Sequence, residues 1–365
     1  MIVGGGLGGL LAALQLAKQD ISVTLFERKQ YPFHRVCGEY ISNETVPFLR
    51  SLDVYPAVFQ PPVIRELQLT SVNGRAVTLP LDLGGFGISR FSFDAFLAHH
   101  VRAAGATVKE QSEVTQVTFN GQGFDVMTEG KHWSADVVIG AHGKRSRLDT
   151  TLNRPFLRKR SPYVGVKYHI RYDQPRERIS LHNFENGYCG ISQVEDGKSN
   201  LCYLVHRDAV KKHHHIPELE KSVLHRNPYL KEIFTNAEFL FDRPEVINEI
   251  SFATKGPLEG HVLMGGDAAG MITPLCGNGM AMAIHASKLL AEEVGAFCRN
   301  EITRDQMEQR YATRWNNLFA KRLWAGRQIQ NLFGSEWASN LAVNLARFAP
   351  PIANFLIRQT HGQPF

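Results

Sequence analysis

The first thirty residues restrict the fold of this chain more than any other segment. A short apolar run at residues 1–3 is followed by Gly4-x-Gly6-x-x-Gly9 and by leucines and alanines at helical spacing. Residues 21–27 are then almost continuously apolar or β-branched, as in a strand buried in a parallel sheet. A strand, a glycine loop, a helix and a second strand in this order predict a doubly wound α/β fold.

This segment has the residue types that bind a dinucleotide. Gly4 permits a tight turn, Gly6 lets backbone amides approach a pyrophosphate, and Gly9 lets the helix pack on the strand. The helix presents its positive N-terminal end to the phosphates, and Leu7 belongs to the same predicted site. Glu27, at the end of the second strand, can accept hydrogen bonds from an adenosine ribose. A dinucleotide cofactor is therefore predicted, and FAD and NAD are both open at this point.

A second glycine motif, far downstream, helps to choose between FAD and NAD. Gly265-Gly266-Asp267-Ala268-Ala269-Gly270 follows a short apolar strand, and residues 274–279 lead into a helix expected over about 279–297. It resembles the Gly-Asp motif of the FAD-dependent family that contains aromatic hydroxylases and geranylgeranyl reductases. The resemblance implies that the aspartate binds a ribityl hydroxyl of FAD and that the helix N-terminus faces the flavin, where it stabilises negative charge. The residues implied in flavin binding are Gly266, Asp267, Gly277, Asn278 and Gly279.

Further residues extend the resemblance over most of the chain. Arg90 matches a family arginine near the flavin, and Val114 matches a position whose backbone meets the adenine. Arg28 and Arg35 complete the predicted cofactor-binding set.

A third family motif, usually Gly-Ala-Asp-Gly-x-x-Ser, is matched by residues 140–146, with His142 in place of the aspartate. In the hydroxylases of the family that aspartate helps to organise FAD and the pyridine nucleotide. Either the histidine keeps a structural hydrogen bond, which we expect, or it has acquired a new role.

The segment Arg35–Ser42 points to one branch of the family. It resembles the Cys-Gly element of geranylgeranyl reductases, which places a cysteine near the isoalloxazine ring. The resemblance implies a catalytic role for Cys37 as a proton donor in alkene reduction; the alternative is a small, inert residue buried beside the flavin. The Trp-x-Phe-Pro substrate element of those reductases is absent, and Phe184–Ser192 stands in the corresponding region.

The motifs also define the expected domains. Both glycine motifs must reach one flavin, so the FAD-binding domain is discontinuous, with an inserted β-rich substrate domain and a helical C-terminal tail. The predicted boundaries are 1–64, 85–155 and 255–300 for the FAD-binding domain, 65–84 and 156–254 for the substrate domain, and 301–365 for the tail. Asn73-Gly74 predicts a hairpin joining residues 66–72 to 76–81. Asp94–Ala104 and residues 217–235 are expected to be helical.

Composition narrows the partners and the compartment. The formal net charge is +6, but the basic residues are spread and no nucleic-acid motif is present, so no nucleic-acid partner is expected. The five cysteines include no C-x-x-C pair, which favours free thiols and a reducing, cytoplasmic location. The histidine run at 213–215 lacks partners at a ligating spacing, so no metal site is expected.

The tail is basic and aromatic. Between residues 303 and 365 there are eight arginines or lysines and three acidic residues, interleaved with tryptophans and phenylalanines. Helices of this type either dock on the protein body or lie on a membrane surface. We expect docking, with a peripheral membrane contact as the alternative.

No hydrolase, zincin or phosphate-transfer motif appears, so the cofactor must carry the difficult chemistry. The resemblance implies that NADH or NADPH reduces FAD, which then acts on a hydrophobic small molecule. Arg35–Ser42 favours double-bond reduction of the geranylgeranyl reductase type. One alternative is an FAD-dependent monooxygenase that hydroxylates an aromatic or polyketide-like substrate. Another is a flavin electron carrier without substrate turnover, although a carrier needs no large β-rich domain.

Overall fold

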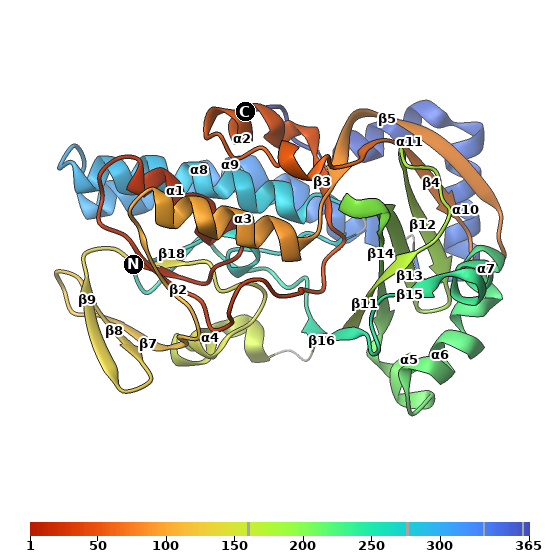
Figure 1. Ribbon diagram of the computed structural model, residues 1–365, viewed down its shortest axis with the longest axis horizontal. Helices are drawn as coiled ribbons and strands as arrows, with labels where there is room; N and C mark the ends of the chain where they lie inside the picture. Colours follow the sequence, from red (N-terminus) through yellow and green to blue (C-terminus); the bar gives the residue numbers. More distant parts are fainter. Residues whose placement is uncertain (159–160, 275–276, 331–332, 360) are drawn as a thin grey trace.

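The computed structural model describes residues 1–158, 161–274, 277–330, 333–359 and 361–365. Two large sheets organise the molecule, one at each end of its long axis (Figure 1). The first half is built mainly on a parallel sheet and the second on a mostly antiparallel sheet. The predicted α/β class, with its Rossmann-like domain, β-rich insertion and helical tail, is confirmed.

The first half contains a six-stranded sheet in the order β17-β18-β10-β1-β2-β6. Its strands are β1 (Ile2–Val3), β2 (Thr24–Phe26), β6 (Thr107–Lys109), β10 (Ile139–Gly140), β17 (Leu258–Glu259) and β18 (Val262–Met264). All but β17 run parallel. The turns that follow β1, β10 and β18 therefore lie at the same edge of the sheet, which is where ligands bind in this class of fold.

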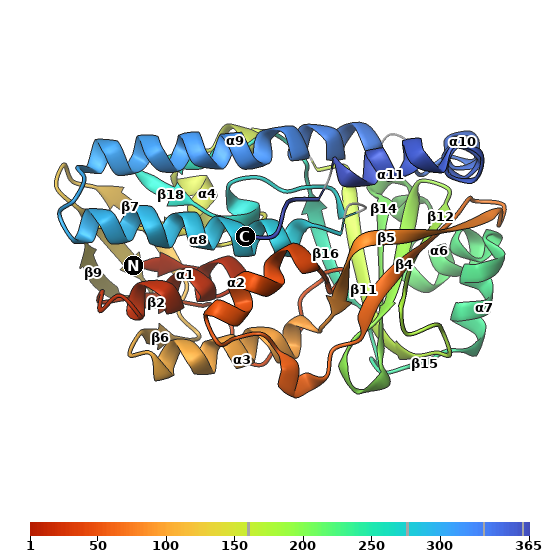
Figure 2. The same ribbon diagram turned by 90° about the horizontal axis from the view of Figure 1, so that it is seen from above.

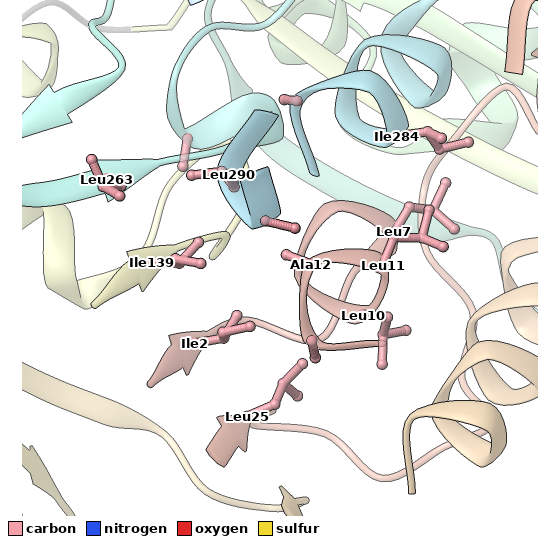
Figure 3. Close-up of a cluster of buried hydrophobic side chains, with 14 of the residues drawn as sticks. Ile2, Leu7, Leu10, Leu11, Ala12, Leu25, Ile139, Leu263, Ile284 and Leu290 are labelled. Atoms are coloured by element: carbon pink, nitrogen blue, oxygen red, sulfur yellow. The ribbon is translucent and has the colours of Figure 1, made fainter. Parts of the chain in front are cut away.

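Different layers cover the two faces of this sheet (Figure 1). One face carries the helices α1 (Leu7–Ala17), α3 (Arg90–Ala103) and α8 (Gly279–Cys298). The other carries a three-stranded sheet of β7 (Val114–Phe119), β8 (Phe124–Thr128) and β9 (Lys131–Ala135), with α4 (Arg147–Thr151) beside it. Every residue of α1 is buried, because the helix lies between the sheet and α8. Figure 3 shows Leu11 and Ala12 of α1 in the cluster formed with Ile139 and Leu290.

The second half is a nine-stranded sheet in the order β15-β11-β14-β13-β12-β4-β5-β3, with β16 also paired to β11. Its strands are β3 (Tyr40–Ser42), β4 (Val63–Thr70), β5 (Ala76–Gly87), β11 (Tyr163–Arg171), β12 (Arg178–Phe184), β13 (Gly187–Gln193), β14 (Ser199–His206), β15 (Glu238–Phe239) and β16 (Glu245–Ile250). The predicted hairpin at Asn73-Gly74 is confirmed, since Thr70 pairs with Ala76.

Alternate side chains of strand β11 point to opposite faces of the sheet, and the two faces have different neighbours. Val164, Val166, Tyr168 and Ile170 join a core with the helices α5 (Arg207–Lys212), α6 (Ile216–Ser222) and α7 (Pro228–Asn236). The residues between them point the other way, and an added Cβ on Gly165 would lie 3.1 Å from Val36. The opposite side of β11 therefore faces the segment that contains Cys37.

Two helices differ from their predicted extent. Helix α3 begins at Arg90 rather than Asp94, because the Ser89 side chain accepts a hydrogen bond from the Ser92 amide and caps the helix four residues earlier. The helical stretch expected at 217–235 is divided into α6 and α7. The side chain of Asn227 caps α7 and Pro228 occupies its first turn, so a new helix starts there.

The tail contains α9 (Arg304–Gln330), α10 (Glu336–Phe348) and α11 (Pro350–Arg358), and a short helix α2 (Val46–Ser51) lies in the first half. Tyr311, Trp315 and Phe319 of α9 belong to the main core, so this helix docks on the first half. Figure 2 shows α9 running alongside α8 and leading to α10 and α11 at the second half. In the described part of the chain, no helix is both long and apolar enough to cross a membrane.

Candidate active site

The glycine loop after β1 is tightly packed at Gly4 and Gly9 and less crowded at Gly6. An added Cβ on Gly9 would lie 2.0 Å from the Gly4 oxygen, and one on Gly4, which has a φ of +106°, would lie 2.4 Å from the Ala141 oxygen. Above Gly6, only the Arg90 guanidinium comes within 4 Å of such a Cβ. Backbone amides at the start of α1, where Leu7 is the first helical residue, therefore lie close to the Arg90 guanidinium.

Glu27 is held at this loop by backbone donors. Its Oε2 accepts a hydrogen bond from the Gly5 amide at 2.9 Å, and its Oε1 accepts one from the Lys29 amide at 3.0 Å. The Arg35 guanidinium donates to Oε2 at 2.9 Å. The carboxylate thus lies beside the loop, as binding to an adenosine ribose requires, whereas the Arg28 side chain is exposed at the surface.

A chain of charges leads from Glu27 toward the second half. Arg35 donates through Nε to Asp94 at 3.0 Å, and Arg90 donates to both oxygens of Asp94 at 2.7 Å. Burial lowers the pKa of Arg90, and the Asp94 carboxylate more than offsets this, so the arginine stays charged. Two predicted cofactor residues, Arg35 and Arg90, therefore share one buried carboxylate close to the glycine loop.

The second glycine motif meets the first through α8. An added Cβ on Gly8 would lie 3.4 Å from the Ala283 oxygen, and one on Gly266 would lie 3.4 Å from the Ala283 Cβ. Because Ala283 lies near the start of α8, the N-termini of α1 and α8 and the Gly-Asp motif converge at one edge of the sheet. The structure brings the two distant motifs together as one cofactor would need.

Asp267 lies among basic side chains at this junction. Burial raises the pKa of its carboxyl group, and Lys255, Arg90 and Lys144 oppose that rise. Lys255 also donates to the backbone oxygen of Asp267 at 3.0 Å. Burial lowers the pKa of both lysines to about 8. These three basic side chains are suited to a pyrophosphate or to a reduced, negatively charged flavin.

The start of α8 is shaped for close approach. Gly277 has a φ of +64°, and an added Cβ there would lie 2.9 Å from the Tyr40 ring. Asn278 is buried and caps the helix without a side-chain hydrogen bond to it, and Gly279 is its first residue. Leu275 and Cys276, which belong to the same sequence element, lie outside the described residues. The first amides of α8 have no acceptor within the helix itself, as at the start of any α-helix.

His142 has a structural hydrogen bond. Its Nε2 lies 3.0 Å from the Asp149 carboxylate, which also accepts from Arg154 at 2.9 Å and from the Ser146 amide at 2.7 Å. Burial raises the pKa of Asp149, but these partners lower it to about 2. Arg154 donates in turn to the Ala268 oxygen at 2.8 Å. The third motif is therefore tied to the Gly-Asp motif, which supports the structural interpretation of His142.

Cys37 lies between the two halves of the molecule. Its backbone oxygen accepts a hydrogen bond from Asn200 of β14 at 3.1 Å, and Arg90 lies beside its thiol. Burial raises the pKa of the thiol, with Arg90 opposing the rise. A raised pKa keeps the sulfur protonated at neutral pH, as a proton donor requires and a thiolate nucleophile does not.

A buried ionic cluster that the sequence did not reveal supports this segment. Glu39 is fully buried with a φ of +54°; it binds the Lys167 ammonium, and its Oε2 lies 2.7 Å from His169 Nε2. Burial raises the pKa of Glu39, while Lys167 and then His169 lower it to about 2. The Arg90 amide also donates to Glu39 at 2.8 Å. The cluster fixes the cysteine segment against β11 and the start of α3.

One signal for this cluster was present in the sequence. Lys167 and His169 are alternate polar residues in an otherwise apolar strand, so they share one face of β11. The sequence could not identify their partner, because Glu39 is far away along the chain. Val114 is the buried first residue of β7, and its expected backbone contact with the adenine stays a prediction.

These observations fit FAD better than a smaller cofactor. The loop over α1 and the Glu27 carboxylate suit an adenosine diphosphate, and the start of α8 with Asp267 suits a second, flavin-bearing half. A protein-family model described as an FAD binding domain matches residues 1–315. The chain belongs to this FAD-binding family.

The proteins that this chain resembles include enzymes with different reactions. The chain is 25% identical over 335 residues to a digeranylgeranylglycerophospholipid reductase of Methanosarcina acetivorans, covering 86% of this chain and 79% of the relative. It resembles a geranylgeranyl bacteriochlorophyll reductase-like structure from Thermoplasma acidophilum, with a TM-score of 0.76, 19% identity and 98% coverage of both chains. A myxobacterial chondrochloren halogenase gives a TM-score of 0.75 at 19% identity, covering 100% of this chain and 93% of its own. The protein is thus an FAD-dependent oxidoreductase, and the solved structures establish only its fold.

Proposed function

We propose that this FAD-dependent oxidoreductase reduces carbon–carbon double bonds in a hydrophobic, isoprenoid-type substrate. The observation that carries the proposal is the position of Cys37, a protonated thiol held between the flavin-binding half and the β-rich half. The resemblance of Arg35–Ser42 to geranylgeranyl reductases and the similarity to a digeranylgeranylglycerophospholipid reductase support it.

Each group of side chains has a separate role in the proposed reaction. Glu27 and the amides at the start of α1 would hold the adenosine half of FAD, Asp267 would hold the ribityl chain, and the start of α8 would face the ring system. FAD held there in its reduced form would supply two electrons and one hydrogen as a hydride. The Cys37 thiol donates the matching proton, so that one hydrogen is added to each carbon of the double bond. Glu39, Lys167 and His169 keep the cysteine segment in place.

We infer that NADH or NADPH is the electron donor and that the enzyme works in the cytoplasm. The nearby lysines, Lys144 and Lys255, have pKa values of about 8 and remain largely protonated at neutral pH. Their charge suits the approach of an anionic donor.

The test is anaerobic turnover of a defined probe. The FAD-loaded protein is reduced with NADPH in the absence of oxygen and mixed with a digeranylgeranylglyceryl phospholipid in detergent. We expect flavin reoxidation together with products that have gained pairs of hydrogen atoms in mass spectra. Reduced flavin that persists with this probe and with geranylgeranyl diphosphate would contradict the proposal.

A monooxygenase is the second candidate. The observation in its favour is Phe184–Ser192, which stands in the region where the reductases carry Trp-x-Phe-Pro and here forms part of β12 and β13. Oxygen uptake that an aromatic or polyketide-like compound stimulates, coupled to a hydroxylated product, would select it. A stable semiquinone with neither activity would select the electron carrier.

A further inference from the structure

Helix α10 has two apolar faces. Its inner face packs Ala342 and Val343 against the β-rich sheet. Its outer face carries Trp337, Leu341 and Phe348 at helical spacing, and the side chains of Trp337 and Phe348 are among the most exposed, at 76% and 78%. A helix that lies between a protein core and water normally has a polar outer face. The outer face of α10 is therefore built for a second apolar environment.

The neighbouring helices enlarge this surface. Among the described residues, ten large hydrophobic side chains are exposed, and seven of them lie on α9, α10 and α11. Both views place α10 and α11 together at the end of α9 (Figures 1 and 2), and Ala346 and Ala353 of the two helices share a small core. We define the tail surface as Trp324, Trp337, Leu341, Phe348, Ile352 and Phe355. Large apolar side chains exposed on consecutive helices are typical of an interaction site.

The charged residues near the tail surface indicate which kind of partner it binds. Lys321 and Arg347 are exposed on α9 and α10, and Glu336 is the acidic residue of α10. Arg358 of α11 is exposed but pairs with Asp82 of β5. Lysine and arginine beside exposed aromatic residues are the features of a surface that binds anionic lipid. A symmetric contact between two copies would bring the tail surface of one copy, with its arginines, against the same surface of the other. Charge therefore favours a lipid surface over self-association.

We propose that the tail surface binds the interface of an anionic lipid bilayer as a peripheral contact. Tryptophan and phenylalanine enter the headgroup boundary while Lys321 and Arg347 meet lipid phosphates. No described helix could span the bilayer, so the contact involves one leaflet. Binding of the tail surface to a bilayer can be tested without turnover, whatever reaction the enzyme catalyses.

The experiment is sedimentation of the FAD-loaded full chain with vesicles. Vesicles of equimolar phosphatidylcholine and phosphatidylglycerol are compared with vesicles of phosphatidylcholine alone. We expect binding to the anionic vesicles, and a loss of at least about tenfold in apparent partitioning for the double variant W337S/F348S, equivalent to about 1.4 kcal/mol. The matched control is Val58→Ser, an exposed apolar residue outside the tail, which should bind like the unmodified protein. No binding by the unmodified protein, or equal binding by W337S/F348S, would overturn the proposal.

Three further measurements keep the result interpretable. Reversing charge in K321E/R347E should remove the preference for anionic over neutral vesicles, and an unchanged preference contradicts the assigned role of charge. Brominated lipids should quench the tryptophan fluorescence of the unmodified protein, which requires no variant to fold. Light scattering tests the competing occupant: a dimer that W337S/F348S converts to monomers, with no vesicle binding by either form, would assign the tail surface to a second copy of the chain.

Discussion

Asp267 is the residue that tests the flavin site most directly. Asp267→Ala removes the carboxylate expected to bind the ribityl chain, and one hydrogen bond to a charged group contributes about 1.5–3 kcal/mol. We expect the variant to fold and to bind FAD roughly 10- to 150-fold more weakly. Titration of the apoprotein with FAD measures this. Asp173→Ala, at an exposed position, is the control, and unmodified affinity in Asp267→Ala would refute the assigned role.

Cys37 is the residue that distinguishes alkene reduction from hydroxylation. Cys37→Ser keeps the size of the side chain, so FAD content and flavin reduction by NAD(P)H should survive. If the thiol donates the proton, the oxidative half-reaction with the alkene should slow by about 10²–10⁴-fold. Stopped-flow measurement of both half-reactions tests this, with the exposed Cys298→Ser as the control. A change of only a few-fold would remove Cys37 from the mechanism and favour the hydroxylation alternative.

At the scale of elements, His142 joins β10 to α4 through Asp149. His142→Asn keeps a donor and should cost about 1 kcal/mol or less, whereas His142→Asp sets a second carboxylate beside Asp149 and should cost about 1–3 kcal/mol at neutral pH. The shared site raises one carboxyl pKa in the folded state. The penalty is therefore present above that pKa and disappears as pH falls through it. Urea unfolding at several pH values measures the difference in the free energy of unfolding between His142→Asn and His142→Asp. This difference should decrease toward acid pH. A difference that does not depend on pH would argue against charge as its cause.

Helix α9 belongs to the main core, whereas α10 and α11 pack on the β-rich half. Ending the chain at Ile302 removes Tyr311, Trp315 and Phe319, and each large aromatic lost from a core costs about 3–5 kcal/mol. This approaches the whole stability of a typical protein, so aggregation or early melting is expected. Ending the chain at Gly334 keeps α9 and should leave a protein that retains FAD. A soluble chain that ends at Ile302, with unchanged melting and only vesicle binding lost, would contradict the docking of α9.

At the scale of the molecule, Glu39 and Lys167 connect the two halves. Glu39→Gln leaves the fully buried Lys167 without its carboxylate, which should cost about 3–5 kcal/mol, and E39Q/K167M should recover much of the loss. The pKa of Glu39 is lowered to about 2. Its contribution is therefore complete above its usual pKa of 4.5 and is lost as pH falls toward 2. Unfolding between about pH 5 and about pH 3 should show this dependence in the native protein and not in E39Q/K167M. An identical dependence in both proteins would place the acid sensitivity elsewhere.

Local rules explain which elements were predictable. Asn73-Gly74 sets its hairpin, because the turn and the alternation of the flanking strands agree. The start of α3 was missed because the Ser89 cap had been outweighed by apolar periodicity. The break before α7 was missed for a similar reason, since Asn227-Pro228 stops one helix and begins another. In both cases a capping side chain decided the boundary.

The sequence by itself predicted the glycine loop and the Glu27 carboxylate, since both depend on residue types at short spacing. It predicted the Gly-Asp motif through its resemblance to the FAD-dependent family. Only the tertiary structure decided that Glu39 pairs with Lys167 and His169, that Arg35 and Arg90 share Asp94, and that the outer face of α10 is apolar. These facts depend on which segments meet in space. Sequence spacing cannot supply that information, because contacts between distant segments depend on how the two sheets and the tail pack together.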